Sequence, residues 1–126
     1  MKNIFALLGA IGAVLGVALG AFGAHALKQT LSPEALAVFE TGVRYQMYHS
    51  FGLFVAAWAA ERFPSAHVSR AGWAFVAGIV LFSGSLYALT LTDVRGFGLV
   101  TPVGGVAFLA GWLFLAIGFW KQRTSA

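Results

Sequence analysis

The sequence predicts an all-α membrane protein, a bundle of four transmembrane helices with an amphipathic segment before or continuous with the second one. Of its 126 residues, 60% are hydrophobic and only 10% are charged, whereas soluble domains carry about 25% charged residues. A water-soluble monomer of this size cannot cover so much apolar surface with so few charges. Three stretches without Asp, Glu, Lys, Arg or His are each long enough to cross a bilayer core of about 30 Å.

These three stretches predict transmembrane helices at about 4–24, 71–91 and 101–120. The remaining span is expected at about 45–61, where the uncharged part alone would give roughly 24 Å of helix. Arg44 and Tyr45 at one end, and Glu61 and Arg62 at the other, are residue types that favour headgroup depth or reach it with long side chains. The four spans together predict a single membrane domain over residues 1–126.

The segment 33–44 is expected to form an interfacial helix. Ser32 can cap it, Pro33 suits the first helical position, and Glu34 lies near the positive end of the helix dipole. The apolar residues after them recur at helical spacing, which is typical of an amphipathic helix at a membrane surface. We expect this helix to run, or to bend at Gly42, into the second span.

The charges predict the orientation. The net charge of +4 comes from eight Lys and Arg against four Asp and Glu, and the basic residues are too dispersed for a nucleic-acid site. Four spans would place both termini on one side, with five Lys and Arg there and three on the other side, which favours termini in the cytoplasm. An alternative interpretation takes Lys2, the first apolar stretch and Ala24-His25-Ala26 as a cleaved signal peptide.

Small residues predict how the helices pack. Association in lipid depends on close van der Waals contact, which small side chains permit. The first span carries such residues at a spacing of four, and the third and fourth spans carry further glycines. The packing positions we expect are Gly12, Gly16, Gly20, Ala24, Gly78, Gly84, Gly104 and Gly111.

A cluster of polar side chains is the candidate functional site. We expect it near the outer interface, where the first span ends and the second begins. Its members either pair with one another and fix two helices, or line a pocket for a lipid headgroup, a quinone or an anion. Glu40 and Arg44 stand in the favourable order for a helical ion pair. The full set is His25, Glu40, Arg44, Tyr45, Gln46, Tyr48, His49 and Ser50.

The sequence indicates no catalytic residues, no metal site and no cofactor. Ser50 and His49 are neighbours on a helix and point apart, so they do not suggest a nucleophile with its base. No span core carries an acid, which argues against a proton-coupled exporter. An oligomeric small transporter or channel stays open. So does a haem- or quinone-binding protein that uses His25 and His49, which would be the two axial ligands in the case of a haem.

Four segments carry a family resemblance: GAFGAHALK at 20–28, FETGVRYQMYHS at 39–50, FSGSLY at 82–87 and TPVGGVAFLAGW at 101–112. They closely resemble the bacterial family known as domain of unknown function 423, whose vertebrate relatives are called transmembrane protein 256. The resemblance implies a small multi-pass protein of the bacterial cytoplasmic membrane without an assigned activity. We therefore expect a non-enzymatic accessory or scaffolding protein whose partners are membrane lipids, further copies of itself or another membrane protein.

Overall fold

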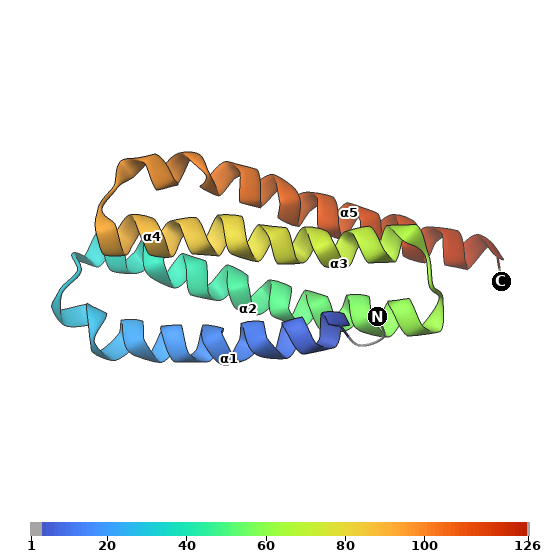
Figure 1. The fold of residues 1–126 in the computed structure, drawn as a ribbon, viewed down its shortest axis with the longest axis horizontal. Coiled ribbons are helices and arrows are strands. Elements are labelled where there is room, and N and C mark those ends of the chain that lie inside the picture. The colour runs from blue at the N-terminus through green and yellow to red at the C-terminus, as the bar shows by residue number, and fades with distance from the viewer. Residues whose placement is uncertain (1–3, 126) are drawn as a thin grey trace.

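The computed structural model describes residues 4–125, and these residues are helical apart from short connections (Figure 1). The all-α class predicted from the sequence is confirmed. In chain order the segments are α1 (Ile4–His25), η1 (Leu27–Gln29), α2 (Pro33–Arg62), α3 (Ala66–Gly78), η2 (Ile79–Ser83), α4 (Gly84–Thr92), η3 (Arg95–Leu99) and α5 (Thr101–Ser125).

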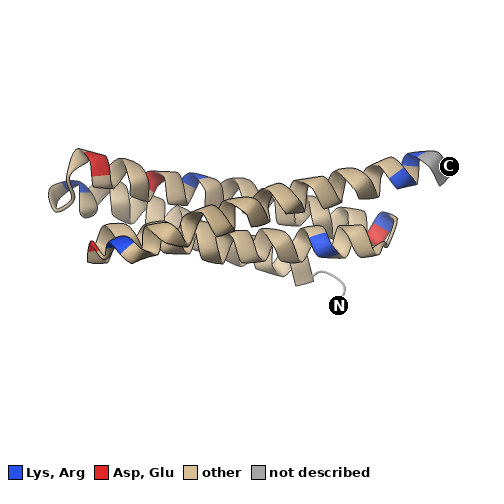
Figure 2. Ribbon diagram, turned by 90° about the horizontal axis from the view of Figure 1, so that it is seen from above, with Lys and Arg blue, Asp and Glu red and all other residues tan. Residues whose placement is uncertain are grey.

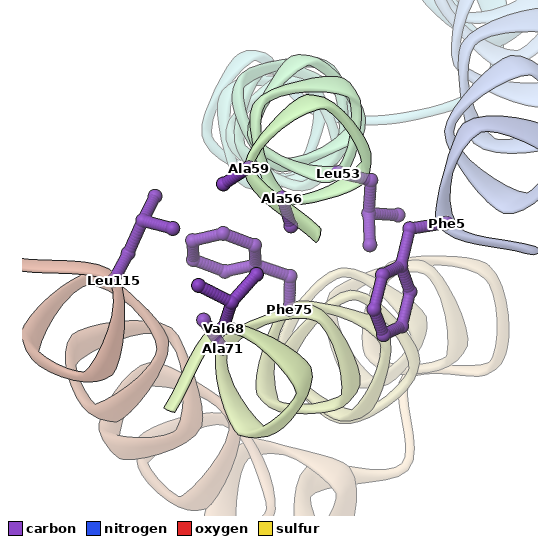
Figure 3. Close-up of a cluster of buried hydrophobic side chains, with 8 residues drawn as sticks. All are labelled: Phe5, Leu53, Ala56, Ala59, Val68, Ala71, Phe75 and Leu115. Atoms are coloured by element: carbon purple, nitrogen blue, oxygen red, sulfur yellow. The ribbon is translucent and has the colours of Figure 1, made fainter. Parts of the chain in front are cut away.

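The helices form four long rods that lie side by side and alternate in direction (Figure 1). One rod is the continuous run of α3, η2 and α4. Seen along the bundle, α1 and α5 lie on opposite sides of the central pair α2 and α3, and Phe5 and Leu115 reach the core from these two sides (Figure 3). Both described ends of the chain lie at the same end of the bundle (Figure 1).

Helix α2 begins where the sequence predicts, because the Ser32 hydroxyl accepts a hydrogen bond from the Ala35 N–H at 3.1 Å and Pro33 occupies the first position. It then continues unbroken to Arg62. Of the two expected forms, the structure has the continuous one: the segment 33–44 is the first part of α2 and runs alongside α1, where Gly23 faces the Phe39 ring. The helix continues through Gly42 without a break. This glycine is buried, and it allows the close approach of Tyr87.

Glycines bring the backbones together, as the small-residue spacing predicts. A Cβ at Gly104 would lie 2.7 Å from the Phe82 Cα, so α5 contacts the backbone of η2 directly. Most of the predicted packing positions face a neighbouring helix in this way: Gly12, Gly16, Gly20, Gly78, Gly104 and Gly111. Two of the predicted positions make no such contact within the described part of the chain. Ala24 is exposed, and a Cβ at Gly84 would meet nothing within 4 Å, because both lie off the contact face of their helix.

The apolar core lies in the half of the bundle nearer the termini, where Phe75, Leu53 and Val68 are almost fully buried (Figure 3). Charged residues gather toward the two ends and leave the middle of the bundle without charge (Figure 2). Three stretches are long and apolar enough to cross a membrane: Ile4–Gln29, Ala66–Thr92 and Arg95–Arg123. The predicted span at 45–61 is not among them, because polar side chains such as Gln46 and His49 make that stretch less apolar than the other three.

Candidate functional site

His49 lies near the middle of the bundle. It follows Pro33 by sixteen residues and precedes Arg62 by thirteen, which corresponds to about 24 Å and 20 Å of helix. The neighbouring Ser50 faces Gly12, itself near the middle of α1. His49 and Ser50 therefore lie level with the middle of α1 rather than with its end, where the sequence led us to expect the polar cluster.

Hydrogen bonds occupy both ring nitrogens of His49. The Trp112 indole N–H donates to Nε2 at 3.0 Å, and Nδ1 lies 2.7 Å from the Tyr45 carbonyl oxygen. An indole nitrogen only donates, so Nε2 must be unprotonated and Nδ1 must carry the proton that it gives to Tyr45. The ring is therefore neutral, only 4% exposed, and has no free lone pair for a metal or for a substrate proton.

Aromatic rings enclose His49 on several sides. The Phe108 ring stacks on the imidazole with centroids 3.5 Å apart and an interplanar angle of 8°. Phe75 and Trp112 pack at 5.5 Å and 5.8 Å in tilted orientations. These rings come from α3 and α5, so His49 connects α2 to both helices by packing as well as by hydrogen bonding.

Gln46, one turn before His49, connects three helices. Its Nε2 donates to the Gly12 carbonyl of α1 at 2.8 Å, and its Oε1 accepts from the Tyr87 hydroxyl of α4 at 2.6 Å. Nearby, the Ser50 hydroxyl donates to the Gln46 carbonyl, and the Ser83 hydroxyl of η2 donates to the Gly42 carbonyl. We call these side chains the central network: Gln46, His49, Ser50, Ser83, Tyr87 and Trp112.

A pocket of about 450 Å³ opens beside His49 on the flank of the bundle. It lies between α2 and α5, with Phe82 of η2 contributing to its wall. We call it the lateral pocket, and its lining consists of Tyr45, Tyr48, His49, Phe82, Gly105, Phe108, Leu109 and Trp112. Apart from His49, the lining consists of aromatic side chains, one leucine and one glycine. The pocket therefore suits a flat or chain-like apolar ligand.

Two tyrosines supply the free polar groups of the lateral pocket. Tyr45 is 36% exposed and Tyr48 is 51% exposed, and their rings contact each other with centroids 5.5 Å apart. Among the residues that the structure describes, neither hydroxyl has a hydrogen-bond partner. Because both ring nitrogens of His49 are hydrogen-bonded, these two hydroxyls are the side-chain polar groups of the lining residues that remain without a partner among the described residues.

The predicted polar cluster is thus divided into separate groups. Gln46, His49 and Ser50 are buried in the central network, whereas Tyr45 and Tyr48 line the lateral pocket. Glu40 and Arg44 are both exposed, and within the described part of the chain they form no ion pair with each other. The predicted ion pair is therefore not present in this structure.

His25 is far from the other members of the predicted cluster. It is exposed at the end of α1, about 20 Å of helix from Gly12, the residue that lies level with Ser50. Two axial ligands must approach a single iron from opposite faces of one haem. The interpretation of His25 and His49 as such a pair was wrong, because the antiparallel register of α1 and α2 separates them.

Sequence reasoning missed several members of the site, among them Trp112, Phe108 and Tyr87. Trp112 gave a signal, because it lies in the middle of its span, away from the interface where tryptophan is enriched. A mid-membrane indole needs an acceptor for its N–H, and His49 supplies it. Phe108 and Tyr87 gave no such signal, since their roles depend on which helix faces α2.

The two serine hydroxyls of the central network donate to backbone carbonyls. Ser50 and Ser83 each donate to a carbonyl of α2, at 2.8 Å and 2.6 Å, so neither is positioned beside a base as a nucleophile would be. Over residues 4–125, the structure places no three His, Asp or Glu side chains together in a way that would hold a metal ion.

Comparison with known proteins identifies the family. The profile of the family described as protein of unknown function (DUF423) matches residues 19–105. The UPF0382 membrane protein YwdK of Bacillus subtilis is 50% identical over 116 residues, which cover 91% of this chain and 94% of that protein. The UPF0382 membrane protein of Haemophilus influenzae is 42% identical over 125 residues, covering 98% and 99%.

No solved structure matches the chain. The family resemblance predicted from the four segments is confirmed, and so is a membrane location, which the relatives' names and the three apolar helical stretches both support. The chain belongs to the DUF423 family of membrane proteins of unknown function.

Proposed function

We propose that this chain is a non-enzymatic, four-pass protein of the bacterial cytoplasmic membrane that binds a flat, carbonyl-bearing apolar ligand, the chemistry of an isoprenoid quinone, in the lateral pocket. The observation that carries the proposal is the pair of unpartnered tyrosine hydroxyls, Tyr45 and Tyr48, in an aromatic pocket halfway along the bundle.

The fourth pass follows from the place of α2. This helix of 30 residues runs antiparallel to α1 and to the α3–α4 rod over their whole length (Figure 1). If the three apolar stretches cross the bilayer, α2 crosses with them. Its polar side chains fit this position, because Gln46, His49 and Ser50 are buried and hydrogen-bonded to neighbouring helices, which removes most of the cost of placing them in lipid.

The orientation rests on the basic residues. Arg62, Arg70, Lys121 and Arg123 lie at the bundle end that holds both described chain ends, and Lys2 precedes the described residues. Lys28, Arg44 and Arg95 lie toward the opposite end. The excess of Lys and Arg favours a cytoplasmic location for the termini.

The ligand class follows from depth and chemistry. A ligand in the lateral pocket would stack on Phe82 and Phe108 and accept hydrogen bonds from Tyr45 and Tyr48. Ester carbonyls of ordinary lipids lie at the interface, whereas a quinone carries its ring carbonyls into the apolar layer. The centre of the bundle is filled by buried side chains such as Phe39 and Phe75, so binding at the flank suits one copy better than transport through its middle.

A fluorescence titration tests this proposal, since quinones quench tryptophan emission at contact and Trp112 lines the pocket. Decylubiquinone added to the purified protein in lipid nanodiscs is expected to give saturable quenching, while decanol gives none. The double variant Tyr45→Phe/Tyr48→Phe should weaken binding about 10- to 100-fold through the loss of two hydrogen bonds. Quenching that rises linearly and equally in both proteins would contradict the proposal.

A further inference from the structure

Helix α2 exposes a continuous face along its whole length, on the side away from the other helices. Each residue of this face is exposed, and Phe51 and Trp58 are 57% and 53% exposed. We call it the outer face of α2, and it consists of Ala37, Glu40, Arg44, Tyr48, Phe51, Val55, Trp58 and Arg62.

Charge distinguishes this face from the exposed faces of the other rods. Glu40 and Arg44 lie about 10 Å and 16 Å along the axis of α2 from Pro33. Between them in the chain are Gly42, which packs on α4, and Val43, which packs on α1. The Glu40 and Arg44 side chains are exposed and unpaired with each other over residues 4–125. An exposed acid and base one turn apart can each be paired by a partner that supplies the opposite charge at the same level.

The spacing of the face fits a helix of the same kind. Ala37, Arg44, Phe51 and Trp58 recur every seven residues, and a seven-residue repeat keeps one seam of a helix facing a partner helix over several turns. The repeat is confined to exposed positions, so it is not explained by packing within the chain.

We propose that a second copy of this chain covers the outer face of α2, with the two α2 helices side by side in the same orientation. A twofold axis along the bundle brings equal levels of the two helices together. Glu40 and Arg44 lie one helical turn apart, about 6 Å along the axis, and the long arginine side chain spans that distance. Arg44 of each copy can therefore extend to Glu40 of the other instead of meeting the second Arg44, and two reciprocal ion pairs form. The face is complementary to itself, which favours a second copy over any partner with a single sign of charge.

This dimer does not depend on the ligand of the lateral pocket. Tyr48 lies at the border of both surfaces, but the charged pair and the seven-residue repeat lie outside the pocket lining. A failure of quinone binding therefore leaves the dimer in place, and a failure of the dimer leaves the pocket in place.

Single-cysteine cross-linking in phosphatidylcholine vesicles tests the face, because the natural chain has no cysteine. Phe51→Cys is expected to form a disulfide-linked dimer on oxidation. Ile11→Cys is the matched control: Ile11 is 45% exposed on α1, at the level of Phe51, since Gly12 faces Ser50 and Gly9 faces Leu53. Equal cross-linking of the two variants would overturn the proposal.

Charge reversal in the Phe51→Cys background tests the ion pairs. Glu40→Arg alone and Arg44→Glu alone should each lose the cross-link, because like charges then face each other. A mixture of the two variants, carrying tags of different size, should regain it as a mixed dimer only. This recovery also shows that both variants fold. Cross-linking that is unchanged in the single variants, or absent from the mixture, would overturn the assignment, and the latter result would point instead to an anionic lipid at Arg44.

Discussion

The indole of Trp112 donates a hydrogen bond to the imidazole of His49 across the space between α5 and α2, although the two residues are 63 positions apart in the chain. This contact completes the hydrogen bonding of a buried histidine near the middle of the bundle. Both residues also line the lateral pocket. The same pair therefore contributes to the stability of the bundle and to the wall of the proposed binding site.

Replacing Trp112 with Phe should destabilise the folded protein. The change leaves Nε2 of His49 buried without a donor, and an unpaired buried acceptor costs about 1–3 kcal/mol. Thermal unfolding in detergent should show the loss as a lower midpoint. Trp120→Phe is the control, because Trp120 is 61% exposed near the end of α5. A midpoint for Trp112→Phe equal to that of the control would contradict this role.

Gln46→Leu should lower the free energy of unfolding by about 1–3 kcal/mol. The substitution removes the side-chain hydrogen-bond partner of the Gly12 carbonyl and of the Tyr87 hydroxyl in the interior. Tyr87→Phe should cost less, since it removes only one of the two hydrogen bonds. The double variant should be more stable than the sum of the two losses implies, because the residues share a bond. Strict additivity in a denaturation series would show that the Gln46–Tyr87 bond contributes nothing.

Gly104→Ala should weaken the contact between α5 and η2, since its Cβ would press on the backbone at Phe82 rather than on a movable side chain. Such overpacking typically costs about 1–3 kcal/mol. Gly84→Ala is the matched substitution and should be neutral or stabilising, because open space surrounds that position and alanine favours helix. The unfolding midpoint of Gly104→Ala should therefore be lower than that of Gly84→Ala. A higher midpoint for Gly104→Ala would refute the packing argument.

Cysteine labelling of whole cells tests the proposed orientation. Gly96→Cys and Gln29→Cys lie at the end opposite the termini and should react with a membrane-impermeant maleimide added outside. Ser69→Cys, exposed at the other end, should react only after the cells are opened. Reaction of all three in intact cells, or of Ser69→Cys alone, would exclude a four-pass arrangement with cytoplasmic termini.

Local signals in the sequence predicted the helices well. Ser32 and Pro33 mark the start of α2, and six of the eight predicted small-residue positions face a neighbouring helix. These features depend on residues near one another in the chain, whose capping and close packing follow directly from residue type.

The geometry of the site could not be predicted in the same way. Periodicity shows which face of a helix is buried but not which helix it faces, or at what level. Gly42 therefore suggested a bend, whereas it admits Tyr87, and His25 was placed near His49. The partner of each polar side chain depends on the register between rods, which close contacts such as Gly12 with Ser50 determine.

The wide turn at Ile79–Ser83 is a π-helix within an otherwise α-helical rod. It accommodates one residue more than a regular α-helical turn would, and its wider winding absorbs that residue. Winding the same residues as regular α-helix would rotate everything beyond the turn about the rod axis. Tyr87 would then turn away from Gln46, and Ser85 from Thr101. The width of this one turn therefore keeps the far half of the rod aligned with α2 and α5, and a relative without the extra residue could reach the same alignment with a regular turn.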